Sequence, residues 1–324
     1  MNARLNALLQ KWAIHDWGED STIFLDLAAI QWLGQKVFSD YEPSQFDRFE
    51  DRLDRWLHNI SEEQEQQTLF LLLNHLFFIG RPEFESLCRA AFHGPISRWL
   101  VEQLNIDIAD PEAMTLIQAG LEHTWFCPIT DSMRINSFLK VNKLVGKSHR
   151  PDWRSLRKFG DPKKISQYLA DNAIARIVLL EDFVGSGTQM RSVVRFAAEM
   201  SADVQVFVSP LVACPDGEAI GKGFGAKYAN VSYSSIMQIA PSALIKADPQ
   251  SGEPPLYVAI RALILRVRAR LGAQEEDVES QRFHGYKGTG AVVAMYSNCP
   301  NNSLPILHDE TSQWAPLFPR IRRG

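Results

Sequence analysis

The sequence has little that would support an exported, metal-binding or membrane-spanning protein. Its four cysteines are far apart and form no C-x-x-C pair, so neither a zinc site nor a disulfide framework is indicated. The most apolar run, TLFLLLNHLFFIG at residues 68–80, is shorter than the roughly 18 residues that a bilayer span requires. We therefore expect a cytoplasmic protein that makes no contact with a membrane.

Length and composition predict a globular chain with more than one domain. The 324 residues are enough for two domains of ordinary size, and a hydrophobic content of 45% provides a substantial core. The formal net charge of −4 argues against a uniformly basic nucleic-acid binder. Local basic patches are still compatible with that average.

The first part of the chain has a helical pattern. The segment FDRFEDRLDRWLHNI has an apolar stripe at helical spacing, and SEEQEQQTLFLLLNHLFFIG predicts a helix that closes on Gly80. We expect residues 1–120 to form an all-helical domain that docks a partner or mediates oligomerisation.

The pattern changes after Gly120. Short β-branched runs, namely HTWFCPIT, ARIVLLE, VQVFVSPLV and VSYSSIM, alternate with helical segments. Such alternation predicts an α/β domain at residues 121–324 with a parallel sheet covered on both faces.

The stretch RIVLLEDFVGSGTQM at residues 176–190 places two acids before a glycine loop. We expect a strand at 176–180, a loop at 181–187 and a helix from about residue 188. In open α/β sheets ligands bind beyond the carboxyl ends of strands, and a loop entering a helix offers backbone N–H groups to an anion. The stretch therefore predicts a site for a phosphorylated ligand.

Common phosphate and nucleophile motifs do not fit this loop. A Walker A loop needs a lysine that is missing, and Met190 occupies the third glycine position of a dinucleotide fingerprint. A nucleophile elbow fails because Gly185 directly precedes Ser186. One alternative stays open, in which the acids only cap the following helix.

Two acids, two apolar residues and a small-residue loop after a strand closely resemble the motif of type I phosphoribosyltransferases that binds phosphoribosyl pyrophosphate. The resemblance implies that Glu181 and Asp182 hold the ribose and help to position Mg²⁺, with no cluster of protein ligands for the metal. It also implies a phosphate-binding loop, made of Gly185, Ser186, Gly187, Thr188 and Gln189. Gly185 departs from the purine-salvage members, which often have a proton-accepting acid at that position.

A second segment, TWFCPITDSMRINSFLKVN, resembles the pyrophosphate loop of the same enzymes. By that resemblance Asp131 and Arg134 join the acid pair as catalytic candidates, and Ser132 contributes to ligand binding. The later segment NCPNNSLPILHDETSQWAPLFPR resembles the PRTase-CE group of bacterial conflict systems. That group includes effectors encoded beside retron reverse transcriptases, and the resemblance covers residues 121–324.

A basic segment lies between the first two expected strands of the sheet. Residues 134–164 contain ten Lys or Arg side chains and only two acids. This segment fits a polyanion, either pyrophosphate or a nucleic-acid backbone, although a solvated helical face would have the same composition. Trp153 within it would either stack on a base or pack in the core.

The resemblance predicts a Mg²⁺-dependent phosphoribosyl transferase or nucleotide-cleaving toxic effector of a retron-type antiphage system. Its ligand would be phosphoribosyl pyrophosphate or a nucleotide, and its partners a reverse transcriptase with its RNA or DNA. The alternative is a non-catalytic module of the same fold that senses a nucleotide or docks to a partner.

Overall fold

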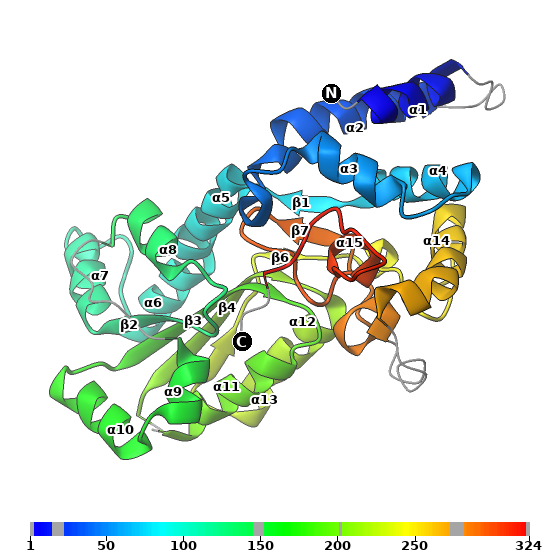
Figure 1. Ribbon diagram of the computed structural model, residues 1–324. Coiled ribbons are helices and arrows are strands. Elements are labelled where there is room, and N and C mark those ends of the chain that lie inside the picture. The colour runs from blue at the N-terminus through cyan, green and yellow to red at the C-terminus, as the bar shows by residue number, and fades with distance from the viewer. Residues whose placement is uncertain (1–2, 15–22, 145–151, 201–202, 273–281, 322–324) are drawn as a thin grey trace. The chain divides into compact units, whose positions relative to one another are not determined.

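The computed structural model describes residues 3–14, 23–144, 152–200, 203–272 and 282–321 (Figure 1). The chain forms two compact units. One, here called the split unit, joins Met1–Arg81 to Pro241–Gly324, and the other, the sheet unit, consists of Pro82–Ala240. None of the helices within the described ranges is long and apolar enough to cross a bilayer.

The sheet unit is built on a five-stranded parallel sheet, which confirms the predicted α/β class. Its strands are β2 (Thr124–Pro128), β3 (Arg176–Val184), β4 (Gln205–Ala213), β5 (Val231–Tyr233) and β6 (Met237–Gln238). The order is β2-β3-β4-β5, and β6 pairs with the distal end of β4. Both central strands are almost fully buried, as expected of a parallel sheet covered on two faces.

Strand β3 is longer than the sequence predicted. It continues through both acids to Val184, which pairs with Ala213 of β4. The extension arises because β4 runs alongside it for its whole length, and the amide of Cys214 donates to the carbonyl of Val184 at 2.8 Å. The acid pair therefore lies on a rigid strand rather than in a loop.

Helices surround this sheet on both faces. They are α5 (Arg81–Ala91), the π-helical turn Phe92–Ile96, α6 (Ser97–Leu104), α7 (Ala113–Glu122), α8 (Ile135–Val141), α9 (Trp153–Phe159), α10 (Pro162–Asp171), α11 (Thr188–Met200), α12 (Pro215–Lys222) and α13 (Phe224–Lys227). Because the strand order rises steadily along the chain, right-handed crossovers place successive connecting helices on one face. The other face is covered by helices that precede β2, together with α8 of the β2–β3 connection, whose Phe138 ring lies 5.9 Å from that of Phe126.

Aromatic contacts identify the helices that cover this second face. Phe126, Val178 and Phe207 are aligned across three neighbouring strands. The ring of Trp99 in α6 stacks on Phe207, with centroids 5.2 Å apart, and Phe92 lies 6.3 Å from Phe126. Helix α6 and the turn before it thus belong to the sheet, as Figure 1 also shows.

The two compact units differ from the expected division at Gly120. Residues 82–122 belong with the sheet because they cover its second face, and residues 241–324 belong with the first 81 residues. Local sequence patterns do not reveal the strand order of the sheet. They therefore do not reveal which helices are needed to cover its second face.

The split unit contains helices and one small sheet. Its elements are α1 (Ala3–Ile14), α2 (Ile23–Lys36), α3 (Phe49–Leu57), α4 (Glu63–Leu72), β1 (Phe77–Ile79), α14 (Pro255–Val267), β7 (Val293–Met295), α15 (Pro305–His308) and short 3-10 turns at Phe38–Asp40, Glu42–Ser44, Leu73–His75, Pro241–Ala243, Arg268–Leu271, Arg282–His284 and Tyr286–Gly288. The prediction that the helix continues to Gly80 is wrong, since α4 ends at Leu72. Residues 77–79 form a strand because they pair in parallel with β7.

Buried polar contacts join the two parts of the split unit. The indole of Trp56 donates to the carbonyl of Ile306 at 2.7 Å. The amide side chain of Asn59 pairs with the backbone of Ala315, donating at 2.8 Å and accepting at 2.9 Å. The C-terminal segment is therefore fixed by α3 and by the residues that follow it.

Arg52 makes more of these buried hydrogen bonds than Trp56 or Asn59 does. Its side chain is 1% exposed and donates to the backbone carbonyls of Leu317, Ser44, Asp47 and Phe38. Burial lowers the pKa of its guanidinium below the ordinary value. A buried cation is tolerated here because carbonyl oxygens surround it.

We predict that Arg52→Met lowers the free energy of unfolding by about 3 kcal/mol, because it leaves several buried carbonyls without a donor. The measurement is urea unfolding followed by circular dichroism. Arg55→Met is the matched control, since that side chain is 49% exposed. Equal losses in the two variants would contradict the role assigned to Arg52.

Candidate functional site at the carboxyl edge of the sheet

Two neighbouring acids of β3 form the centre of the site. Glu181 is 5% exposed and Asp182 is 6% exposed. Burying carboxyl groups costs free energy unless hydrogen bonds replace their water. The loop that follows β2 supplies such bonds.

Thr130 and Ser132 bind the acid pair. The backbone amide of Thr130 donates to Glu181 Oε2 at 2.9 Å, and its hydroxyl lies 2.5 Å from Oε1. The Ser132 hydroxyl lies 3.1 Å from Glu181 Oε1 and 2.9 Å from Asp182 Oδ1. We call these four residues the acid-pair site.

The number of protons in this network indicates that one of the acids is neutral. The hydroxyls of Thr130 and Ser132 are also 2.8 Å apart, so four oxygen–oxygen contacts link the four residues. Each hydroxyl has a single proton to donate. If both carboxyls are ionised, two protons must serve four contacts. A proton on Glu181, whose Oε1 takes part in two of the contacts, supplies a third donor.

Electrostatics favours the same protonation state. Burial, and secondly the neighbouring Asp182 carboxylate, raise the pKa of Glu181 to about 8. The donors on Thr130 and Ser132 act in the opposite direction but do not offset burial. The raised pKa favours a proton on Glu181 at neutral pH.

The glycine loop lies directly after β3. Gly187 has a φ of +70°, a left-handed conformation that suits glycine. A Cβ at Gly187 would lie 3.2 Å from the Cα of Gly217 in α12, and the Gly217 amide donates to the Gly185 carbonyl at 3.0 Å. The loop is thus held closely against the start of α12.

The hydroxyls of this loop face one another at the start of α11. Ser186 Oγ and Thr188 Oγ1 are 3.2 Å apart, and the side chains of Thr188 and Gln189 are exposed. The first amides of an α-helix have no partner within the helix. Together with the hydroxyls they can bind a phosphate group.

The structure brings together some of the predicted site residues. Ser132 contacts both acids directly. Asp131 and Arg134 lie in the same loop, where Arg134 precedes α8 and Asp131 is exposed. The catalytic roles of Asp131 and Arg134 stay predictions.

Sequence reasoning missed Thr130, which makes the closest contact to Glu181. The signal that could have identified Thr130 is its position in TWFCPIT, where it is the first polar residue after the strand β2. Strand β2 is the parallel neighbour of β3, which carries the acid pair. A second buried acid, Glu218 in α12, was also missed. It accepts from Tyr233 at 2.7 Å and from Gln238 at 2.8 Å, and it ties α12 to β5 and β6.

The interpretation of Trp153 as a base-stacking residue is wrong. Its side chain is fully buried, and its ring meets that of Trp125 edge-on at 5.3 Å. It belongs to the core between the sheet and α9–α11.

The donor set fits Mg²⁺ only in part. Among the described residues no three His, Cys, Asp or Glu side chains gather as a metal site would require. Mg²⁺ is commonly held by one or two carboxylates together with phosphate oxygens of the substrate. Asp182 suits that role better than Glu181, whose two oxygens both contact Thr130.

The raised pKa of Glu181 predicts a measurable pH dependence of stability. Between the ordinary value of 4.5 and about 8, the folded protein retains a proton that the unfolded chain has lost. The Glu181 contribution to the free energy of unfolding therefore decreases as pH rises, by at most about 1.4 kcal/mol per pH unit.

Urea unfolding from pH 5 to pH 8 measures this effect as the difference between wild type and Glu181→Gln. We expect the variant to lose less stability than wild type across the window. Glu199→Gln, at an exposed position on α11, should behave like wild type. Parallel pH profiles for wild type and Glu181→Gln would show that Glu181 is ionised throughout.

Comparison with known proteins gives one family. The family model described as PRTase-CE matches residues 53–320, so the similarity begins well before residue 121, where the sequence resemblance was placed. No curated protein and no solved structure matches the chain. Since the match covers most of the sequence and includes the acid-pair site and the glycine loop, the chain is a phosphoribosyltransferase-like member of the PRTase-CE family.

Proposed function

We propose that the acid-pair site and the adjoining glycine loop bind the phosphoribosyl part of phosphoribosyl pyrophosphate or of a nucleotide. In this proposal the protein is a Mg²⁺-dependent phosphoribosyl transferase or nucleotide-cleaving enzyme. The observation that carries it is the buried acid pair on β3, bound to the loop after β2 and followed by a loop suited to phosphate.

The residues divide between ribose and phosphate. Asp182, the carboxylate of the pair, is suited to accept hydrogen bonds from the ribose hydroxyls. Ser186 and Thr188, with the first amides of α11, are suited to the 5′-phosphate. Neutral Glu181 acts as a positioning residue, because through Thr130 and Ser132 it holds the loop after β2 against Asp182.

The proposed chemistry takes place at the anomeric carbon of the ribose. The bond from this carbon to the leaving group breaks, the leaving group departs with the electron pair, and an acceptor or water bonds in its place and loses a proton. A carboxylate beside the ribose stabilises the positive charge that develops on the ring. Gly185 provides no carboxylate to take the released proton, so the acceptor or another group must supply that function.

Bound Mg²⁺ would neutralise charge on the departing phosphate groups. Asp182 is the protein ligand that we assign to it, with phosphate oxygens completing the coordination.

A second candidate is a module of the same fold that senses a nucleotide, or docks to a partner, without catalysis. Two observations favour it: Glu181 is neutral and already bonded on both oxygens, and Gly185 carries no acid. In that case the ligand binds at the same site and leaves unchanged.

The biological context that we propose is an antiphage effector acting with a retron reverse transcriptase and its RNA or DNA. Membership of the PRTase-CE family supports it. Oligomerisation and partner docking through helices of the split unit belong to the same proposal.

We predict that Asp182→Asn weakens binding of phosphoribosyl pyrophosphate in the presence of Mg²⁺ by about tenfold or more, because it removes the charged acceptor of the site. Isothermal titration calorimetry measures the binding, and chromatography of the products measures turnover. Glu199→Gln serves as the control because it changes an exposed acid of the same unit. If Asp182→Asn binds the ligand as tightly as the wild-type protein does, the proposed site is refuted. If the wild-type protein binds the ligand but forms no product, the sensing module is favoured.

The proposed partner is tested by affinity capture of the tagged protein, expressed from its own genomic neighbourhood. We expect a reverse transcriptase and its nucleic acid to be recovered in stoichiometric amounts. Capture of neither, under conditions that preserve the fold, would contradict the effector context while leaving the ligand site unaffected.

A further inference from the structure

The surface of α9 and α10 carries a group of exposed cations. Five basic side chains lie between residues 152 and 164 and all are exposed: Arg154, Arg157, Lys158, Lys163 and Lys164. None forms an ion pair with a carboxylate in the described ranges of the chain.

The two acids within this stretch offset the positive charge only in part, since five cations and two carboxylates leave a net charge of +3 over residues 152–164. Asp152 accepts from the amide of Ser155 at the start of α9, and Asp161 accepts from the amide of Lys163 at the start of α10. Both carboxylates therefore serve as helix caps. The cations are left to face solvent, where a polyanion would replace their counterions.

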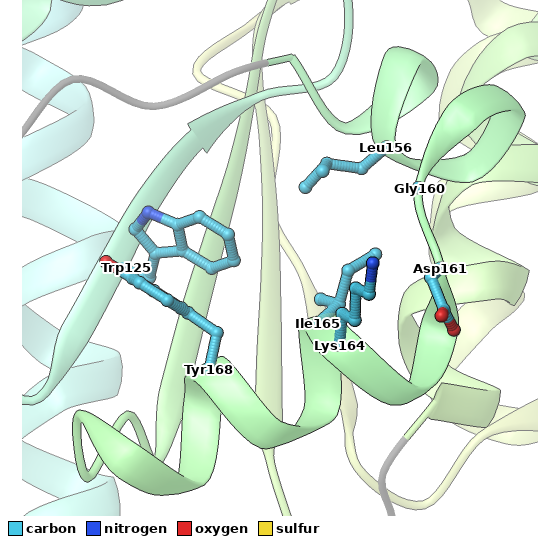
Figure 2. A pocket seen from close by; sticks show the side chains of 7 residues that line it. All are labelled: Trp125, Leu156, Gly160, Asp161, Lys164, Ile165 and Tyr168. Carbon is cyan, nitrogen blue, oxygen red and sulfur yellow. The ribbon is translucent and has the colours of Figure 1, made fainter.

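A cavity of about 400 Å³ opens beside these cations (Figure 2). The rings of Trp125 and Tyr168 form one wall, and Leu156 and Ile165 contribute aliphatic surface. Lys164 and Asp161 supply the charged groups of the lining. The cavity thus combines aromatic and aliphatic walls with a cation, and its size falls in the range of small-molecule sites.

Tyr168 is available to a ligand in this cavity. Its side chain is 42% exposed, and its ring is tilted by 40° against that of Trp125 at a centroid distance of 5.6 Å. A planar ring entering the cavity would meet the wall formed by the rings of Trp125 and Tyr168. Such aromatic faces bind nucleobases of any sequence.

Helix α9 links this cavity to the acid-pair site. The amide of Arg154 donates to the carbonyl of Ile129 at 2.9 Å, so α9 starts beside the loop that follows β2. Leu156, half a turn further on, lines the cavity. Exposed cations are present along this whole path.

We propose that the α9–α10 surface binds single-stranded nucleic acid, with one unstacked base in the cavity beside Tyr168 and with phosphates on the exposed cations. Aromatic walls next to unpaired positive charge match the two parts of a nucleotide, its base and its phosphate. A duplex would not provide the free base that the cavity accepts.

This surface is distinct from the proposed phosphoribosyl site. Trp125 lies near the start of β2, and about 10 Å of strand separates it from Pro128, where the loop that carries Thr130 begins. The inference therefore does not depend on the activity of the acid pair. Asp182→Asn should leave oligonucleotide binding at the α9–α10 surface unchanged. The two proposals can therefore fail independently of each other.

The test is fluorescence anisotropy of the full-length protein with a labelled single-stranded oligonucleotide of about 12 nucleotides. Tyr168→Ala should weaken binding by about tenfold, because the stacking surface is lost, and Tyr168→Phe should restore it. Lys164→Ala should weaken binding and reduce the slope of log affinity against log salt by about one. Duplex of the same sequence should bind more weakly than the single strand.

The matched controls lie in the split unit. Tyr286→Ala removes a tyrosine that is also 42% exposed, and Lys36→Ala removes an exposed lysine of α2; both should bind like wild type. Thermal unfolding checks that each variant is folded. If Tyr168→Ala does not fold, the affinity and the salt dependence of Lys164→Ala test the proposal instead. Equal binding by wild type and folded variants would overturn the proposal, as would tight binding of a mononucleotide with no binding of the oligonucleotide.

Discussion

The hydrogen bonds between the loop after β2 and the acid pair on β3 are the contact on which the candidate site depends. Glu181 is buried beside a second acid, and it is stable there because Thr130 and Ser132 donate to it and because it retains a proton. The same bonds place the loop after β2 against the ligand-binding edge of the sheet. In the proposed function Glu181 organises the site and Asp182 contacts the ligand.

The sheet places a second constraint on the molecule. Its strands follow one another in a single direction, so most connecting helices cover one face, and a segment from earlier in the chain joins α8 in covering the other. The stacking of Trp99 on Phe207 shows that α6 does so. The helical segment before the sheet is therefore in part a structural layer of the phosphoribosyltransferase-like unit.

Local patterns in the sequence were sufficient for the parallel sheet and for the glycine loop that follows β3, although they placed the acid pair in that loop rather than on the strand. They failed where a distant partner decides the structure. Residues 77–79 form a strand only because β7 lies beside them, and β3 extends to Val184 only because β4 does. Thr130 was missed for the same reason, since its importance comes from the neighbouring strand. Trp153 was open to both interpretations, and burial decided for the core.

The central claim is that the loops after β2 and β3 form one ligand site. Hydrogen–deuterium exchange with mass spectrometry, with and without phosphoribosyl pyrophosphate and Mg²⁺, tests it most directly. The account predicts that peptides covering residues 129–134 and 181–189 gain protection together at the same ligand concentration. Protection of only one of these loops, or protection confined to another part of the chain, would contradict it.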